Sequence, residues 1–257
     1  MLKRAFKYPL KLSIIFTIFF NIFAANAQSD DTGDYFEFPQ LPIKSEKLQD
    51  FIPNSWIVEY LQQDDLNNDG VLDTVLVLRS IGQASDGKMS GRFEVANPRM
   101  LIVLFKQGKF WRLVKQDTDF IPQSVIINDE VVDPFHGIVY GGVTAKNGTL
   151  NIRIGFFGSQ MGFYVYRFRW QNGDFNLVGY DYSSTQRTTG TTTEESYNFI
   201  TNKKKTTIET LIIDPILDEA TDKVTTKIKW TKLKPHELLS MDDINEDFSE
   251  YLKDIDT

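Results

Sequence analysis

Residues 65–73, with the sequence DLNNDGVLD, place oxygen-bearing side chains at alternate positions around a glycine. A calcium ion takes roughly six to eight oxygen ligands, several of them carboxylates, and glycine allows the sharp bend that brings such ligands together. We therefore predict a structural calcium site with these ligands, in chain order: Asp65, Asn67, Asp69, the backbone carbonyl of Val71, and Asp73.

A plain turn without an ion is the alternative for the same segment. Asn68, Asp69 and Gly70 suit a turn on their own account, because short polar side chains and glycine tolerate the backbone angles that turns need. Such a turn requires neither Asp65 nor Asp73, however. Three carboxylates in one small loop repel each other unless a cation neutralises them, so we favour the ion.

The spacing of this loop matches the first nine positions of the calcium loop of an EF-hand. Position 12, where an EF-hand carries a bidentate glutamate, is Leu76 in the strand-like run VLVL. The segment therefore resembles the calcium loops of integrin-type (FG-GAP) blades, in which a DxDxDGxxD segment joins two strands. That resemblance implies a calcium ion held in a hairpin, not a propeller. With three carboxylates, we expect a dissociation constant on the order of 10⁻⁴ to 10⁻³ M and a stabilising role.

Catalytic chemistry has few candidates. The only histidines are His136 and His236, and no G-x-S-x-G, H-E-x-x-H, phosphate-loop or dinucleotide-binding spacing occurs. Asp133 and His136, in VVDPFHG, form the best titratable pair, but a surface turn begun by Asp-Pro explains them as well. We predict no catalytic residue and no organic cofactor, and therefore a protein that is not an enzyme. A cell-envelope hydrolase is the remaining catalytic alternative.

The first 27 residues have the pattern of a secretory signal peptide. Basic residues precede a 12-residue apolar run, and Ala25 and Ala27 stand at the small-residue positions before a predicted cleavage at Gln28. The run is shorter than the roughly 20 residues of a membrane-spanning helix, and no later stretch is long and apolar enough to span. We predict export to the periplasm or medium, a flexible terminus over 28–50 and one β-rich domain over 51–257.

Charge and composition limit the classes of molecule that this chain can bind. The chain has 28 basic and 35 acidic residues and no cysteine, so disulfides and thiolate chemistry are excluded. Cleavage of the leader would leave 24 basic against 35 acidic residues, a net charge of −11. This balance argues against nucleic acid or an anionic membrane surface as partner, and it favours a basic protein. An immunity or inhibitor protein that covers a basic toxin or enzyme is therefore a second functional hypothesis.

The elements that would position the loop are mostly strands. TVLVLRS is apolar on both faces and belongs inside a sheet, while SWIVEYLQQ places Trp56, Val58 and Tyr60 on one face. Hairpin turns are predicted at Gln107-Gly108, Asn147-Gly148 and Asn172-Gly173. A further strand pair is expected in SYNFITNKKKTTIETLII, and one or two helical turns in KSEKLQDF.

Later segments vary more in pattern. One strand face gathers Tyr164, Tyr166, Phe168 and Trp170, which we expect to be core, the alternative being a stacking surface for a sugar or base. KVTTKIKW predicts a half-buried strand whose inner face is Val224, Thr226, Ile228 and Trp230. The serine- and threonine-rich stretch 183–196 predicts a solvated hairpin tip or mobile loop. An amphipathic C-terminal helix that caps the core is expected from Met241, Ile244, Phe248, Tyr251 and Leu252.

These patterns predict a mainly β fold, a single antiparallel sheet or sandwich-like domain with one or two short helices. The segments FIPNSW, NPRMLIVLF, DPFHGI and GFYVYRFRW together resemble a group of secreted bacterial proteins. That resemblance implies export and one domain but no particular activity. Our first hypothesis is thus a calcium-stabilised, non-catalytic binding or structural protein of the bacterial periplasm.

Overall fold

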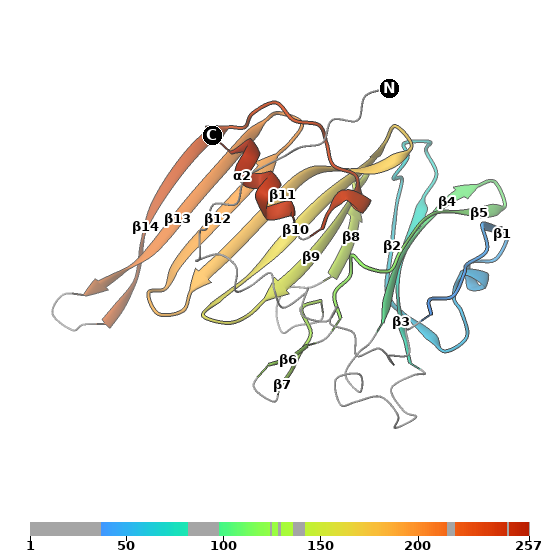
Figure 1. Cartoon of the computed structure of the whole chain (residues 1–257), viewed down its shortest axis with the longest axis horizontal. Helices are drawn as coiled ribbons and strands as arrows, with labels where there is room; N and C mark the ends of the chain where they lie inside the picture. Colours follow the sequence, from blue (N-terminus) through green and yellow to red (C-terminus); the bar gives the residue numbers. More distant parts are fainter. Residues whose placement is uncertain are drawn as a thin grey trace, which may run out of the picture. The chain divides into compact units, whose positions relative to one another are not determined.

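The computed structural model describes residues 37–81, 98–123, 125–127, 130–135, 142–214, 219–245 and 247–256. The predicted leader, its cleavage site and His136 lie outside these described residues. Strands dominate the described residues and pair antiparallel throughout, and a helix lies near the C-terminus, so the predicted fold class is confirmed (Figure 1).

A five-stranded sheet contains the aspartate loop. Its strands, in spatial order, are β1 (Lys44–Ser45), β5 (Phe110–Asp117), β4 (Arg99–Gln107), β3 (Asp73–Ser80) and β2 (Trp56–Asp64). β3 is an interior strand buried on both faces, as its apolar run predicts. The β4–β5 hairpin turns at Gly108 and Lys109, one residue later than expected, because Gly108 supplies the positive φ of 58°. A 3-10 turn, η1 (Leu48–Phe51), confirms the predicted helical turn and buries Phe51.

A seven-stranded sheet forms the rest of the scaffold as a meander. Its strands, in spatial order, are β14 (Glu219–Lys232), β13 (Lys203–Asp214), β12 (Thr191–Asn198), β11 (Asp174–Gln186), β10 (Gln160–Gln171), β9 (Thr149–Phe156) and β8 (Gly142–Lys146). A separate ribbon pairs β6 (Val125–Ile127) with β7 (Glu130–Val132). Both predicted Asn-Gly turns are confirmed, with φ of 54° and 70° at Asn147 and Gly148, and 57° and 86° at Asn172 and Gly173.

The core lies between the two sheets. Val77, Val103 and Phe105 of the smaller sheet belong to one buried cluster with Leu150 and Phe168 of the larger one. Such face-to-face packing removes from water the apolar face of each sheet, which is the main favourable term in forming a sandwich.

The aromatic face of β10 is core, as predicted. Tyr164, Tyr166, Phe168 and Trp170 all pack against the buried cluster. Phe105 of β4 meets Trp170 edge to face, with ring centroids 4.9 Å apart. Burial raises the pKa of Tyr164 to about 12. These rings therefore join the two sheets, which leaves the stacking-surface alternative without support.

The C-terminal stripe also covers the core, but not as one helix. It forms a 3-10 turn, η2 (Met241–Asp243), and then α2 (Phe248–Ile255), which crosses the larger sheet (Figure 1). Asn245 separates the two pieces because its Oδ1 accepts the Asp247 backbone N–H at 2.8 Å, a local bond that competes with helix. Phe248 contacts Tyr166 and Tyr180, with ring centroids 5.6 and 5.1 Å away.

A buried lysine ties the chain end to the sheet. Lys204 Nζ lies 2.7 Å from Glu195 Oε1 and 2.6 Å from Asp256 Oδ2, and it faces the Tyr197 ring at 4.8 Å. Burial by itself would lower the pKa of Lys204, but hydrogen bonds to Asp256, Glu195 and Tyr197 outweigh it and raise that pKa. The lysine thus stays charged and holds the end of α2 on β12 and β13.

The stretch 183–196 is a hairpin, one of the two predicted alternatives, but its tip spans only residues 187–190. β11 runs to Gln186 and β12 begins at Thr191, so most of the stretch is paired strand. Threonine is β-branched and suits a strand, and the Thr185 and Thr192 hydroxyls lie 2.9 Å apart across the pair. A serine- and threonine-rich composition, which is typical of loops, therefore belongs here mostly to paired strands.

Candidate functional site

The aspartate loop joins β2 to β3 and is built around backbone N–H groups. Asn68 and Gly70 have φ of 60° and 85°, which turns several N–H groups inward. Asp65 accepts the Asp69 N–H at 3.0 Å and the Gly70 N–H at 2.8 Å through its two oxygens. Asn67 Oδ1 accepts the Asp69 N–H at 2.9 Å. These bonds neutralise part of the repulsion between the acidic side chains.

Asp73 is more deeply buried than the other acidic residues of the loop. It is fully buried, and its Oδ2 and Oδ1 accept the backbone N–H groups of Leu66 at 3.1 Å and Lys106 at 3.0 Å. Burial raises the pKa of Asp73 to about 6 despite these two bonds. The carboxylate therefore fastens the start of the loop to β4, across the sheet.

The loop also contacts the second sheet. Gly148, in the β8–β9 turn, donates its N–H to Asp64 Oδ2 at 2.6 Å. A side chain at Gly148 would begin 3.4 Å from Asn68 Oδ1 and 3.5 Å from the Asp65 carbonyl oxygen. The loop is thus a joint between the two sheets. Across the described residues, no group of three or more His, Cys, Asp or Glu side chains is placed to hold a metal ion.

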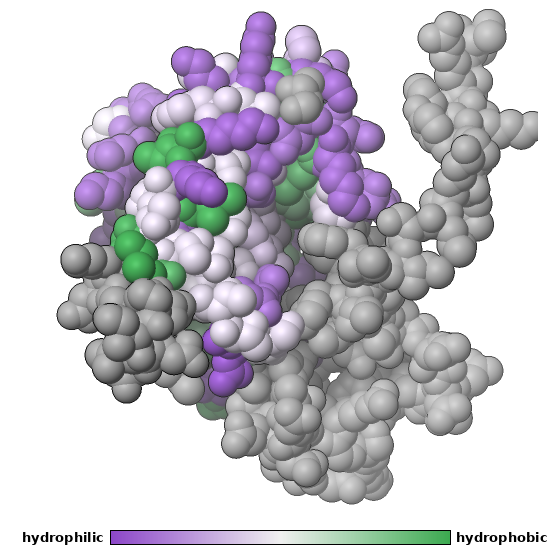
Figure 2. Space-filling model, turned by 90° about the vertical axis from the view of Figure 1, so that its left-hand side faces the viewer, coloured by the Kyte–Doolittle hydropathy of each residue, from purple (hydrophilic) through white to green (hydrophobic). Residues whose placement is uncertain are grey.

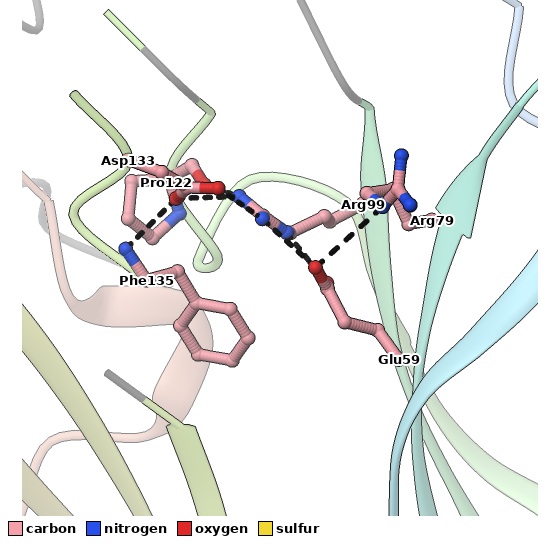
Figure 3. Close-up of polar contacts among 6 residues, drawn as sticks. All are labelled: Glu59, Arg79, Arg99, Pro122, Asp133 and Phe135. Carbon is pink, nitrogen blue, oxygen red and sulfur yellow. Dashed lines mark hydrogen bonds and ion pairs between the residues drawn. The ribbon is translucent and has the colours of Figure 1, made fainter. Parts of the chain in front are cut away.

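A buried arginine forms the strongest charged cluster among the described residues (Figure 3). The Arg99 side chain has no exposed surface. Its Nε and Nη2 donate to the two oxygens of Glu59 at 2.7 and 3.0 Å, and its Nη2 and Nη1 donate to those of Asp133 at 2.6 and 3.1 Å. Nη1 also donates to the Pro122 carbonyl at 2.8 Å, and the guanidinium lies 5.2 Å from the Phe135 ring centroid.

This cluster explains Asp133, which the sequence offered as an acid or base. Both of its oxygens are bonded to Arg99, and Oδ1 also accepts the Phe135 N–H at 3.0 Å. Burial alone would lower the pKa of Arg99, but its bonds to Glu59 and Asp133 outweigh burial and raise that pKa. A permanently charged arginine with two bidentate carboxylates is an arrangement that holds strands together.

Sequence reasoning missed Glu59 and Arg99 because a β-bulge changes the faces of β2. The register shifts between Val58 and Tyr60, so Val58 pairs with Leu78 while Tyr60 pairs with Val77. The prediction that Trp56, Val58 and Tyr60 share one face is therefore wrong, and Val58 is 39% exposed. The extra residue, Glu59, is turned toward Arg99. A signal was present: Arg99 directly precedes the apolar run MLIVLF.

The second histidine is held by the core. His236 Nδ1 lies 2.7 Å from the Lys234 carbonyl oxygen, and its ring meets Phe199 and Tyr251 edge to face. Its contacts are those of a packed side chain near the C-terminal segment.

The edge strand β14 departs most from prediction. We expected Val224, Ile228 and Trp230 to be half-buried, but they are 49, 57 and 66% exposed. They share one face, because Val224 pairs with Leu211 and Trp230 with Lys205. β14 lies at the outer edge of the larger sheet, and Figure 2, which views that edge, shows apolar patches (green) among hydrophilic side chains (purple).

The opposite face of this edge has a shallow hollow. Ile208, Thr210, Thr225 and Lys227 line it, and Ile208 is 38% exposed. The β13–β14 hairpin thus presents apolar side chains on both of its faces.

None of the helices among the described residues has both the length and the apolar character needed to cross a bilayer. No family model, no curated protein and no solved structure matches this chain.

Proposed function

We propose that this chain is an exported, non-catalytic binding protein that holds a partner protein along the edge strand β14. One observation carries the proposal: Val224, Ile228 and Trp230 form a row, each about half exposed or more, on the outermost described strand of the larger sheet. Tryptophan is the residue type most enriched at the energetic centres of protein interfaces. An edge strand with an exposed apolar row is otherwise a hazard for aggregation.

A partner segment in extended conformation fits this edge best. β14 is 14 residues long, and among the described strands it pairs with β13 alone. Its outer side presents a row of backbone N–H and C=O groups that an added strand can pair with, while alternate side chains provide selectivity. Export is supported by the signal-peptide pattern of residues 1–27.

A non-catalytic role is supported by the use of the titratable groups. Asp133 is bonded to Arg99, and His236 is packed against Phe199 and Tyr251. Asp133 and His236 therefore hold the scaffold together, whereas Val224, Ile228 and Trp230 of β14 are exposed.

Removal of the apolar row should weaken partner binding. We expect the double variant Ile228→Ala/Trp230→Ala, used as the full chain, to lose at least about tenfold in affinity for whatever envelope protein the wild type captures. The matched control is Ile43→Ala/Ile81→Ala, because both side chains are exposed, at 78 and 58%, and both flank strands of the smaller sheet. Quantitative pull-down from envelope extract measures the effect. Equal capture by wild type and both variants would refute the proposal.

We also propose that calcium stabilises the aspartate loop. The alternation of Asp65, Asn67 and Asp69 around Gly70 supports this, and a carboxylate oxygen that accepts one N–H keeps a further lone pair for a cation. At about ten times its dissociation constant, calcium should raise the free energy of unfolding by about 1.4 kcal/mol.

Calorimetric titration and thermal melts at millimolar calcium and magnesium test this second proposal. Asp69→Asn should abolish the response, whereas Asp119→Asn, the same charge change in another exposed turn, should keep it. No shift of the wild-type melting temperature in calcium would mean that the loop is stabilised by its N–H bonds alone.

A further inference from the structure

We infer that the segment that binds β14 is an acidic, extended polypeptide in which carboxylate side chains alternate with apolar ones. This inference rests on the proposed function and adds the chemistry of the partner. It depends on the charge pattern of the β13–β14 hairpin, which differs in sign from that of the chain as a whole.

Lysines lie on both faces of the exposed edge, although Glu209 stands opposite Thr226 on the face of the apolar row. Lys227 and Lys229 are exposed on one face, and on the other Lys205 stands directly opposite Trp230. Lys203 pairs with Lys232 one step further along the same face as Trp230. The chain as a whole carries a net charge of −7, so this edge is a local reversal of sign. Lysines beside an apolar row attract carboxylates at the rim while the row itself is buried.

The spacing of these residues matches the period of an added strand. On β14, Val224, Ile228 and Trp230 occupy even positions and Lys227 and Lys229 odd ones, so the two kinds of side chain lie on opposite faces. A partner strand that alternates apolar and acidic residues would place its apolar side chains beside the row and its carboxylates beside the lysines. Opposite charges across a strand pair stabilise it, whereas like charges destabilise it.

A second copy of the chain fits this edge less well. The antiparallel self-pairing centred on Thr226 would set Val224 opposite Ile228 but Trp230 opposite Asp222, so the most exposed member of the row would gain no apolar partner. The same register sets Lys223 opposite Lys229 twice, once on each side of the two-fold axis. Edge lysines in this arrangement oppose self-association. The charge pattern therefore favours a different, acidic chain.

Two synthetic ten-residue peptides test the inference against the full chain. In the first peptide every second residue is glutamate, and the residues between are valine or threonine. The second peptide has lysine in place of each glutamate. We expect the acidic peptide to bind at least about tenfold more tightly by fluorescence anisotropy at low salt, with the preference falling as salt rises. Lys227→Glu/Lys229→Glu should reverse the preference. Lys146→Glu, on the opposite edge strand β8, should leave it unchanged.

The other outcomes overturn the inference in distinguishable ways. Equal binding of both peptides, or no effect of the lysine variant, would refute the inference that the partner is acidic. If Ile228→Ala/Trp230→Ala nevertheless abolishes capture, the proposal that β14 binds a partner would still hold. Binding to vesicles of anionic phospholipid, without any preference between the peptides, would mean that β14 binds a membrane surface and not a polypeptide. Dimerisation that depends on Trp230, measured by sedimentation, would mean that β14 binds a second copy of this chain.

Discussion

Replacing Arg99 with alanine should lower the free energy of unfolding by about 3 to 5 kcal/mol. The substitution would leave Glu59, 4% exposed, and Asp133, 17% exposed, without their shared cation. Glu59 would keep Arg79, whose Nε lies 3.6 Å from its Oε1, but both carboxylates would lose their bidentate partner. Two largely buried carboxylates must then either stay charged without that partner or take up protons, and both outcomes favour the unfolded chain. Urea denaturation at neutral pH measures the loss.

An exposed ion pair provides the control for this prediction. Lys109 lies 2.7 Å from Glu46, with side chains 69 and 52% exposed. Lys109→Ala should therefore change stability by well under about 1 kcal/mol, because water already solvates both charges. Arg99→Lys should fall between the two, since one ammonium cannot replace the planar set of donors that reaches Glu59, Asp133 and Pro122. If Arg99→Ala and Lys109→Ala cost the same, the buried cluster does not hold the strands together.

Asp73→Asn should cost about 2 kcal/mol at pH 7, although the two side chains have nearly the same shape. Each Asp73 oxygen accepts a backbone N–H, one from Leu66 and one from Lys106. The amide group of asparagine would turn an N–H toward one of these donors, and that buried donor would lose its acceptor. Asp69→Asn, in the exposed part of the same loop, should be much less harmful in the absence of calcium.

The cost of Asp73→Asn should also depend on pH, with a definite sign. The pKa of Asp73 is raised from 3.8 to about 6 in the folded protein, so the folded state holds this proton more tightly than the unfolded state does. The stability from this group is complete below the unfolded pKa and is lost as pH rises through about 6. The gap between wild type and Asp73→Asn should therefore widen by about 2 kcal/mol from pH 7 to pH 4.5. A gap that narrows on acidification would contradict the raised pKa.

The aspartate loop shows how far spacing alone can predict a site. The sequence predicted the hairpin between β2 and β3 correctly, because Asn68 and Gly70 adopt their positive φ values for local reasons. It did not separate the roles of the acidic residues. Asp73 binds backbone N–H groups of Leu66 and Lys106, and the latter lies 33 residues further along the chain. Which acceptor meets which donor across a sheet depends on strand register and not on neighbours in the sequence.

The partners of Arg99 could not have been predicted from any local pattern. The cluster joins β2, β4 and the segment after β7, and Arg99 is 40 residues from Glu59 and 34 residues from Asp133. The bulge at Glu59 was hidden as well, since one inserted residue exchanges the faces of the positions that follow it. Polar residues inside a core become recognisable only when the strands that bring them together are paired.

By itself the sequence determined most of the strands, the Asn-Gly turns at Asn147 and Asn172, the mainly β class and the apolar stripe of the C-terminal segment. Each of these follows from backbone preference and side-chain alternation within a few residues. The tertiary structure decided what is covered. The alternation of β14 is that of a half-buried strand, yet Trp230 is 66% exposed because the strand lies at the outer edge of the sheet. Whether a side chain is buried depends on which elements pack against its strand, and the order of the strands in the sheet decides which elements those are.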